Sequence, residues 1–313
     1  MSKSNKVGFI ASISSKLRTK KMRRVLLHSG SIEIEFNKSD GSITFVDRGG
    51  YQSRNVSTIH MFADALKTIR HELDSFRVQV FTGDSPPDDL KPLIFAYCAR
   101  RNQSNVIPVP DFMFWSWPEI GVFDYKEIVS QMLVASKASP LIDKLFWAGN
   151  TRTHPTRKHL FDLAAGRTDM LVEDTVWMPR ERSESFSSDS AMSTKNRNYY
   201  SLPEHCRFKY LIDMQGVGYS ARLKILLFSG RPLFIQSRQW EEYFFDRLVP
   251  FEHYVPVAEN LEDLTERLEW ARSHPVETNG IAAAAQEFAK KNLTREAAIT
   301  YLRDVLLRKF GSH

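Results

Sequence analysis

The stretch KYLIDMQGVGYSARLKILLFSGRPLFIQ, residues 209–236, decides the fold. An apolar run at 210–214 predicts a buried strand, and the Gly-Val-Gly that follows predicts a turn. Apolar residues then recur at helical spacing over 219–228, and a second apolar run at 232–235 predicts another strand. The stretch therefore predicts a β-turn-α-β unit, the building block of an α/β protein.

The glycine turn of this unit is a candidate phosphate site. Glycines ahead of a helix leave backbone N–H groups free, and the positive end of the helix dipole points at the same spot. Ser220 and Arg222 are expected in the first turn of the predicted helix. Gly216 and Gly218 alone are weak evidence, because many tight turns use two glycines.

Strand and helix patterns alternate over the rest of the chain as well. In the second half the alternation favours a mainly parallel sheet. Further helices are expected at 56–73, 125–135 and 241–248, and three more lie within 260–309. The chain is therefore expected to be α/β throughout.

Composition bounds the class of protein. A hydrophobic fraction of 42% is typical of a packed globular chain. The two cysteines, Cys98 and Cys206, fall in different predicted elements, which argues against a disulfide framework and favours a reducing compartment. No apolar run is long enough to span a membrane, and the N-terminus does not resemble a signal peptide. We therefore expect a cytoplasmic protein.

The positive charge of the chain is concentrated at its N-terminus. The net charge is +6, whereas residues 1–24 alone contribute eight Lys or Arg and no acid, so the remainder is slightly acidic. This basic tail is either attracted to an anionic surface, such as the inner face of a membrane, or simply solvated. No nucleic-acid motif accompanies it, so nucleic acid is not an expected partner. The tail is expected to precede a first lobe at 25–140 and a second lobe at 141–313, whose last helices pack back on the first.

Familiar catalytic motifs are missing from the sequence. It has no Walker loop, no GxGxxG, no GxSxG, no HExxH and no Asp-x-Asp pair for a metal-bound diphosphate. Arginines remain: Arg152, Arg157 and Arg222 each follow a predicted strand-to-helix turn, and parallel topology places such turns at one edge of a sheet. There they can clamp a diphosphate without a metal ion or other cofactor. Taken singly, each is more often a surface or salt-bridge residue.

Several separate motifs, in a fixed order, resemble glycosyltransferase family 90, the family of capsule-associated, lipopolysaccharide-modifying and Rumi-type O-glucosyltransferases. They are FWAGNTRTHPTR at 146–157, CRFKYL at 206–211, GVGYSAR at 216–222, WEEYF at 240–244 and LVPFEHYVPV at 248–257. The similarity extends over about residues 75–290 and is densest after residue 146.

The resemblance implies a GT-B architecture, in which two Rossmann-like lobes enclose a donor cleft. It also implies an inverting, metal-independent transfer of glucose, xylose or galactose from a UDP-sugar. Because secretory-pathway relatives carry signal peptides and several cysteines, this chain looks more like the bacterial members. The expected acceptor is therefore a glycan or glycolipid of lipopolysaccharide core or capsule, with the enzyme at the inner membrane face.

The resemblance also assigns donor-binding residues. Thr151 stands where the family has the serine of its donor-phosphate loop, and Arg157 and Arg222 fall on its diphosphate-binding arginines. The residues expected to contact the nucleotide-sugar are Thr151, Arg152, Arg157, Gly216, Val217, Gly218, Tyr219, Ser220 and Arg222.

The family's general base is an Asp in a loop after a strand of the first lobe, followed by an aromatic residue and a proline. Asp84 fits this position, although Ser85 replaces the aromatic residue. Asp88, Asp89 and Asp111 are rival candidates. The alternative for Asp84 is an Asx turn ahead of two prolines.

Aromatic and acidic residues near the expected cleft are further candidates. Trp115 and Trp117 can stack on a sugar or a base, or form a core aromatic cluster. Glu241 and Glu242 are expected to begin the helix at 241–248, where either can hydrogen-bond a hydroxyl of the donor or acceptor.

Other classes of function remain open at the level of sequence. One is a non-catalytic nucleotide or phosphoglycan binder on the same fold, and another is a polyanion-binding structural protein that uses the basic tail. Within the enzyme class, a protein O-glycosyltransferase with a polypeptide acceptor is the alternative to a glycan-modifying enzyme.

Overall fold

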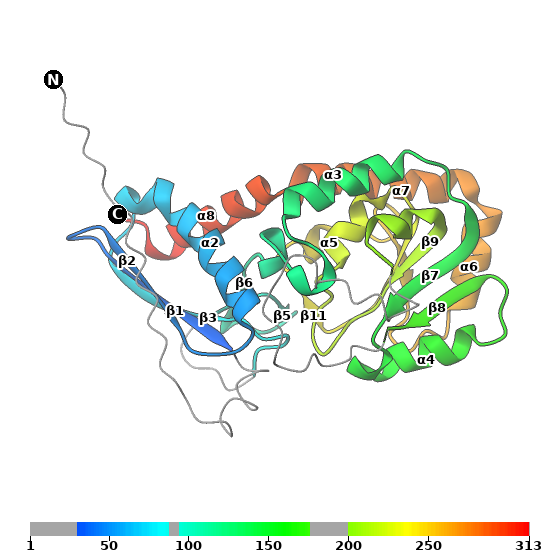
Figure 1. Ribbon diagram of the computed structural model, residues 1–313, viewed down its shortest axis with the longest axis horizontal. Coiled ribbons are helices and arrows are strands. Elements are labelled where there is room, and N and C mark those ends of the chain that lie inside the picture. The colour runs from blue at the N-terminus through cyan, green and yellow to red at the C-terminus, as the bar shows by residue number, and fades with distance from the viewer. Residues whose placement is uncertain (1–29, 88–93, 176–199, 313) are drawn as a thin grey trace.

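The structure is a computed structural model in which residues 30–87, 94–175 and 200–312 are described. It has two lobes, each built on a five-stranded sheet, which lie side by side in Figure 1. The expected two-lobed α/β architecture is confirmed. The basic tail and the segments 88–93 and 176–199 lie outside the described residues.

The sheet of the first lobe is mixed, in the order β2-β1-β3-β4-β6. Strand β1 pairs antiparallel with β2 and β3, whereas β3, β4 and β6 are parallel. The parallel part supplies the Rossmann-like character of this lobe, and the hairpin extends it. The elements are β1 (Ser31–Asn37), β2 (Ser42–Asp47), α2 (Gln52–Ile69), β3 (Phe76–Phe81), β4 (Ile94–Ala96) and β6 (Val106–Pro108).

The sheet of the second lobe is wholly parallel, in the order β12-β10-β9-β7-β8. The chain runs from β7 outward to β8 and then returns to the other side of β7 as β9. This reversal leaves a crevice beyond the ends of β7 and β9, the usual place for a ligand in such sheets. The strands are β7 (Ile142–Gly149), β8 (Met170–Asp174), β9 (Phe208–Asp213), β10 (Leu233–Gln236) and β12 (Val255–Val257).

Alternation along β7 explains how helices cover both faces of this sheet. Leu145 and Trp147 pack in one hydrophobic cluster with α4 (Pro155–Ala164) and α6 (Leu264–Ser273). Phe146 and Ala148 point the other way, into a cluster shared with α3 (Tyr125–Ser136). That second cluster continues into the first lobe, so one hydrophobic core extends across both sheets.

The last helix returns to the first lobe. After α7 (Pro275–Asn292), helix α8 (Arg295–Phe310) runs from the second lobe back across α2 (Figure 1). The ring of Phe310 stacks on that of Phe76 with centroids 4.2 Å apart. Arg295 Nε donates to the carbonyl oxygen of Phe114 at 2.9 Å. The C-terminal helix is thus part of the first lobe's core.

Two predicted helices were wrong. The helix expected at 219–228 is reduced to α5 (Leu223–Leu226) and a 3-10 turn, so Ser220 and Arg222 precede it. The helix expected at 241–248 is absent, because Trp240–Glu241 pairs as β11 with β5 (Ala99–Arg100) of the first lobe. In both places contacts with the other lobe override the local helical pattern.

The lobes meet most closely at Gly218. A Cβ atom on Gly218 would lie 1.9 Å from the carbonyl oxygen of Asp84 and 3.3 Å from the Cβ atom of Ser85. The glycine turn of the second lobe therefore lies against the loop after β3 of the first lobe. Any other residue at position 218 would push the two loops apart.

A buried ionic cluster lies at the same junction. Lys224 Nζ lies 3.0 Å from Asp111 Oδ2 and 2.7 Å from Glu242 Oε1, and all three side chains are almost completely buried. Burial raises the pKa of Glu242 to about 8, although Lys224 opposes the shift. One cation thus joins two carboxyl groups from different parts of the chain.

We expect Gly218→Ala to destabilise the junction by about 1–3 kcal/mol, because the added methyl group overlaps the Asp84 backbone. Gly280→Ala is the matched control, since nothing lies within 4 Å of a Cβ atom there. That change sits inside α7 and should stabilise the chain by about 0.5–1 kcal/mol. Chemical denaturation of both variants compares them; equal stability would contradict the close contact.

We expect the stability contributed by Glu242 to fall as pH rises. Between the ordinary value of 4.5 and about 8 the folded chain keeps the Glu242 proton, whereas the unfolded chain loses it. The free energy of unfolding of the wild type, relative to Glu242→Gln, should therefore decrease across this window. Denaturation at several pH values measures it, with Glu277→Gln as an exposed control; a flat difference would refute the shift.

Candidate functional site

The candidate site lies beyond the ends of β7 and β9, in the crevice of the second sheet. After β7 the chain forms a 3-10 turn at Thr151–Thr153, and His154 caps α4 by accepting a hydrogen bond from the Thr156 backbone. After β9 the chain continues through Met214 and Gln215 into the glycine turn. The motifs at 146–157 and 216–222, which the sequence indicated as donor-binding segments, therefore lie next to each other.

Arg157, in the first turn of α4, reaches from one loop to the other. Its Nε atom donates to the Gln215 carbonyl oxygen at 2.6 Å, and Nη2 donates to that of Met214 at 3.1 Å. Nη1 donates to Thr153 Oγ1 at 2.8 Å. These contacts fix the guanidinium plane between the two strand ends.

Arg222 also lies against Trp147. Its Nη1 atom donates to the Ala148 carbonyl oxygen at 2.6 Å. The Cζ atoms of Arg157 and Arg222 lie 5.3 Å and 5.8 Å from the centre of the Trp147 ring. The indole can fold over this position because residue 149 is glycine, whose Cβ atom would lie 2.6 Å from it. Contact with one aromatic ring offsets part of the repulsion between the two cations.

The arginine pair, Arg157 and Arg222, carries uncompensated positive charge. Within the described part of the chain neither guanidinium forms an ion pair with a carboxylate. Burial, and then the charge of Arg222, lower the pKa of Arg157 to about 9. Burial also lowers the pKa of Arg222, with Asp213 opposing. Both remain charged at neutral pH, and a bound anion would compensate the cost of burying them. The arrangement is that of an anion site.

The helix whose N-terminus lies at this site is α4. The sequence had indicated the helix after the glycine turn instead, and that expectation was wrong. Helix α4 has ten residues and carries Arg157 in its first turn, whereas α5 is only four residues long. The positive end of a longer helix adds to the arginine pair in favouring an anion.

Two more residues of the loop after β7 were expected to contact the sugar donor, and one is buried whereas the other is exposed. Thr151 is buried, and its backbone N–H donates to Asp174 Oδ1 at 3.0 Å. Arg152 is exposed, and its backbone N–H donates to Asn150 Oδ1. The exposed guanidinium of Arg152 is separate from the buried arginine pair.

The glycine turn presents backbone, while two of its side chains are occupied elsewhere. A Cβ atom on Gly216 would lie 3.5 Å from Arg157 Nη2, so the turn borders the arginine pair. The hydroxyl of Tyr219 donates to Asp111 Oδ2 at 2.9 Å. Ser220 Oγ donates to Asp213 Oδ1 at 2.6 Å. Val217 is half exposed, with 52% of its surface accessible.

Asp84 borders the glycine turn from the first lobe. Its Oδ1 atom accepts a hydrogen bond from Arg54 Nη1 at 2.8 Å, and 29% of its side chain is exposed. Its backbone lies against Gly218. A partly exposed carboxylate thus stands across the turn from the arginine pair, where it can reach a ligand bound between the lobes.

The rival acids do not share this position. Asp111 is buried, pairs with Lys224 and caps a 3-10 turn through the Met113 backbone, so it is committed to structure. Asp88 and Asp89 lie outside the described residues.

The remaining candidates are engaged in packing. Trp115 lies between the stacked ring of His60, with centroids 5.0 Å apart, and the guanidinium of Arg295. Trp117 packs edge-on against Phe112. These contacts agree with the core aromatic cluster that was the alternative for both tryptophans.

The two glutamates are paired with cations. Glu241, on β11, forms an ion pair of 2.6 Å with Arg101, while Glu242 belongs to the buried cluster with Lys224. Neither occupies the start of a helix, and Glu242 is inaccessible to a ligand.

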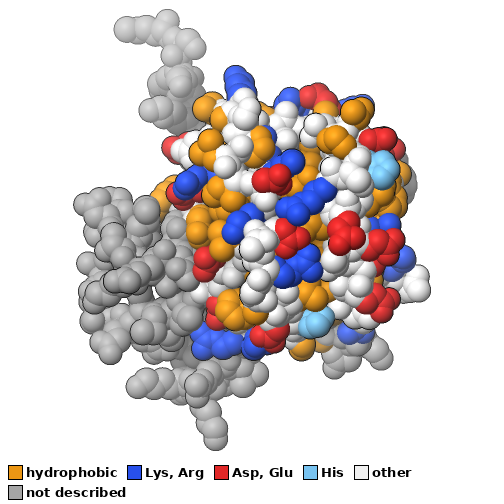
Figure 2. All heavy atoms as spheres, turned by 90° about the vertical axis from the view of Figure 1, so that its right-hand side faces the viewer, with side chains coloured by type: hydrophobic (Ala, Val, Ile, Leu, Met, Phe, Trp, Pro, Cys, Tyr) orange, Lys and Arg blue, Asp and Glu red, His pale blue; other side chains and the backbone are white. Residues whose placement is uncertain are grey.

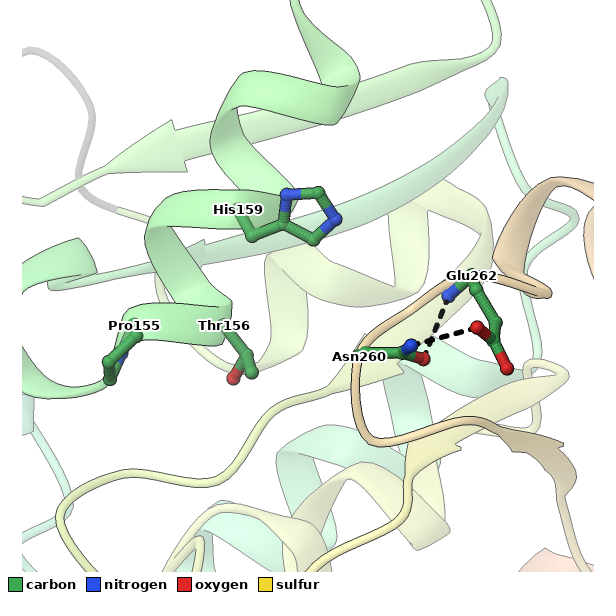
Figure 3. A pocket seen from close by; sticks show the side chains of 5 residues that line it. All are labelled: Pro155, Thr156, His159, Asn260 and Glu262. Atoms are coloured by element: carbon green, nitrogen blue, oxygen red, sulfur yellow. Dashed lines mark hydrogen bonds between the residues drawn. The ribbon is translucent and has the colours of Figure 1, made fainter.

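Two hollows adjoin the start of α4. A small one, of about 110 Å³, borders the glycine turn and is lined by His154, Gln215, Val217, Gln239, Trp240 and Glu259. A wider one, of about 430 Å³, lies between α4 and the loop after β12 (Figure 3). In that view Asn260 and Glu262 form reciprocal hydrogen bonds opposite His159. The arginine pair does not line the wider hollow.

Sequence reasoning missed three site residues. Trp147 lay inside a motif, but nothing in its spacing showed that both arginines lie against its ring. Asp213 ends β9, and the charge of Arg238, 2.7 Å from its Oδ2 atom, balances it. Arg54 lies 30 positions from Asp84, so only the fold reveals that pair.

The structure combines a two-lobed α/β fold with a pair of arginines at the switch point of its parallel sheet, the place where such sheets bind ligands. A model of glycosyl transferase family 90 matches residues 51–312. The chain therefore belongs to glycosyl transferase family 90, as the resemblance in the sequence indicated.

Curated relatives point to the same family. The chain is 29% identical over 213 residues to protein O-glucosyltransferase 2 of Danio rerio, an alignment that covers 66% of this chain and 41% of the relative. It is 25% identical over 248 residues to protein O-glucosyltransferase 1 of Homo sapiens, with coverages of 64% and 60%. The chain thus spans about half the length of the curated relatives it matches.

Solved structures show weaker likeness. A glycosyltransferase from Rickettsia africae gives a TM-score of 0.35 at 9% identity, covering 58% of this chain and 43% of that one. Anabaena HepE, solved in complex with UDP, gives a TM-score of 0.34 at 9% identity, with coverages of 85% and 57%.

Two further features of the described residues are the charge of their surface and the apolar character of their helices. Figure 2, which faces the end of the second lobe, shows basic and acidic side chains interspersed, as on an ordinary solvated surface. Among the described residues, no helix combines the length and the apolar character that crossing a bilayer requires.

We expect Arg157→Met and Arg222→Met each to weaken binding of UDP about 10–100-fold, because each removes charge-assisted hydrogen bonds to an anion. Lys158→Met is the matched control: it removes a positive charge one residue along α4, from a side chain that is 60% exposed. Isothermal titration calorimetry with UDP measures the affinities. Equal affinities in all three variants would show that the arginine pair does not hold the diphosphate.

Proposed function

We propose that this chain transfers a sugar from a UDP-sugar to an acceptor hydroxyl, with inversion at the anomeric carbon. The observation that carries the proposal is the arginine pair, in which Arg157 is buried and Arg222 half-buried. The pair lacks a carboxylate partner among the described residues and lies across the glycine turn from Asp84. Membership of glycosyl transferase family 90 supports it.

In the proposed reaction Asp84 accepts the proton of the acceptor hydroxyl as that oxygen bonds to the anomeric carbon. The bond from this carbon to the diphosphate oxygen breaks on the opposite face, and UDP leaves with the bonding electrons. Arg157, Arg222 and the start of α4 stabilise the charge that develops on the leaving diphosphate. Because these groups are already positive and fixed, we propose that no metal ion is required.

The finer features of the reaction also belong to the proposal. Glucose is the first sugar to test, because the relatives are named O-glucosyltransferases. Those names favour a polypeptide hydroxyl as the acceptor, whereas the sequence favoured a lipopolysaccharide or capsule glycan. Transfer assays with a folded polypeptide and with a glycan acceptor separate the two. Binding of the basic tail (1–24) to anionic liposomes tests the expected membrane attachment.

We expect Asp84→Asn to lower kcat about 10²–10⁴-fold, because the amide cannot accept the proton, while UDP still binds. Asp64→Asn, an exposed change on α2, is the control and should leave kcat unaltered. Turnover with UDP-glucose, and calorimetry with UDP, provide the two readouts.

The same assay tests the leaving-group mechanism. Turnover should persist in EDTA, and strong dependence on added metal would contradict the role of the arginine pair. If Asp84→Asn transferred sugar at the wild-type rate, the base would have to be another residue. A wild-type chain that binds UDP but transfers no sugar from any UDP-sugar would be a non-catalytic binder.

A further inference from the structure

We propose that Arg54 is a positioning residue for Asp84, holding the carboxylate in the first lobe and away from the arginine pair. The inference rests on the proposed function, in which Asp84 is the general base. It adds a residue that neither the sequence motifs nor the family resemblance assigned.

The geometry of Arg54 is fixed on several sides. Its Nη1 atom lies 2.8 Å from Asp84 Oδ1, and only 12% of its side chain is exposed. Its Cζ atom lies 4.5 Å from the ring centre of Tyr51 and 4.7 Å from that of Phe112. A guanidinium stacked on two rings has little freedom to turn, so its hydrogen bond sets the direction of the carboxylate.

The helix that carries Arg54 is itself tied to the loop beside Asp84. Thr58 Oγ1 lies 2.8 Å from the Arg54 carbonyl oxygen and 2.6 Å from the hydroxyl of Tyr97. Next to Tyr97, Cys98 Sγ donates to the Asp84 carbonyl oxygen at 3.3 Å. The backbone and the side chain of Asp84 are therefore both held within the first lobe.

The ion pair is stronger than an ordinary surface contact. Burial alone would lower the pKa of Arg54, but the charge and hydrogen bond of Asp84, together with Tyr219 and Tyr97, outweigh burial and raise the pKa. The other titratable groups that interact with the Asp84 charge are Tyr97, Cys98 and Arg157. Tyr219 faces Arg54 from the second lobe. Arg54 is thus the cation in direct contact with the carboxylate.

The ion pair between Arg54 and Asp84 prevents the carboxylate from competing with a ligand for the arginine pair. A free carboxylate next to two uncompensated arginines would be drawn to them and would compete with a diphosphate. Arg54 gives Asp84 a partner in its own lobe, so the arginine pair stays available to the donor. It also leaves Oδ2, which makes no hydrogen bond with the described residues, to face the acceptor.

The test separates charge from geometry. We expect Arg54→Met to lower kcat/KM about 100-fold, as expected for a displaced base. Arg54→Lys keeps the positive charge but not the planar guanidinium that stacks on two rings, so it should lower kcat less than Arg54→Met and leave UDP affinity near the wild-type value. Arg48→Met, which removes a half-exposed arginine from the same lobe, is the control.

A binding measurement makes the test independent of turnover. UDP affinity should fall about tenfold in Arg54→Met, in which Asp84 is free to compete, and should be restored in Arg54→Met/Asp84→Asn. Wild-type UDP affinity in Arg54→Met, or a loss of affinity that Asp84→Asn does not restore, would overturn the positioning role. If Arg54→Met does not fold, the kcat of Arg54→Lys decides, and a wild-type value would refute the proposal. Failure of the wild type to bind UDP or to transfer sugar would instead overturn the proposed function.

Discussion

The rest of the structure depends on the approach of two backbones, Gly218 of the second lobe and Asp84 of the first. The glycine turn follows β9, the central strand of the parallel sheet, and the Asp84 loop follows β3. Because nothing larger than a hydrogen atom fits at position 218, the contact sets the distance between a carboxylate on one lobe and the arginine pair on the other. The chemistry proposed for the chain requires that separation.

Charge is distributed unevenly on the two sides of this contact. In the ionic cluster Lys224 is paired with Asp111, and the raised pKa of Glu242 keeps that carboxyl group protonated at neutral pH, so the cluster is nearly neutral, whereas the arginine pair leaves positive charge in excess. The ionic cluster therefore does not balance the arginine pair, whose charge acts across the low dielectric of the interior. An anion bound at the arginine pair would offset that charge, and therefore acts on the junction between the lobes as well as on its own site.

Much of this arrangement was readable from sequence. The strands around residues 209–236, the parallel second sheet and the convergence of Arg157 and Arg222 follow from periodicity and topology. The helices at 219–228 and 241–248 were wrong, because Tyr219 is bonded to Asp111 and Trp240 pairs with Arg100, both in the other lobe. Such long-range pairings leave no local pattern. The same holds for Arg54, whose contact with Asp84 exists only once α2 has packed on the first sheet.

The path of α8 has a consequence for how the chain folds during its synthesis. The ring of Phe310 covers Phe76, and Gly311 forms a bridge with Leu73, so the interior of the first lobe is closed by the last part of the sequence. On a ribosome, residues 30–87 emerge long before this cover does. The core of the first lobe therefore cannot be completed, and its apolar surface stays exposed, until the second lobe has been synthesised. Although the two lobes have separate sheets, their folding is coupled.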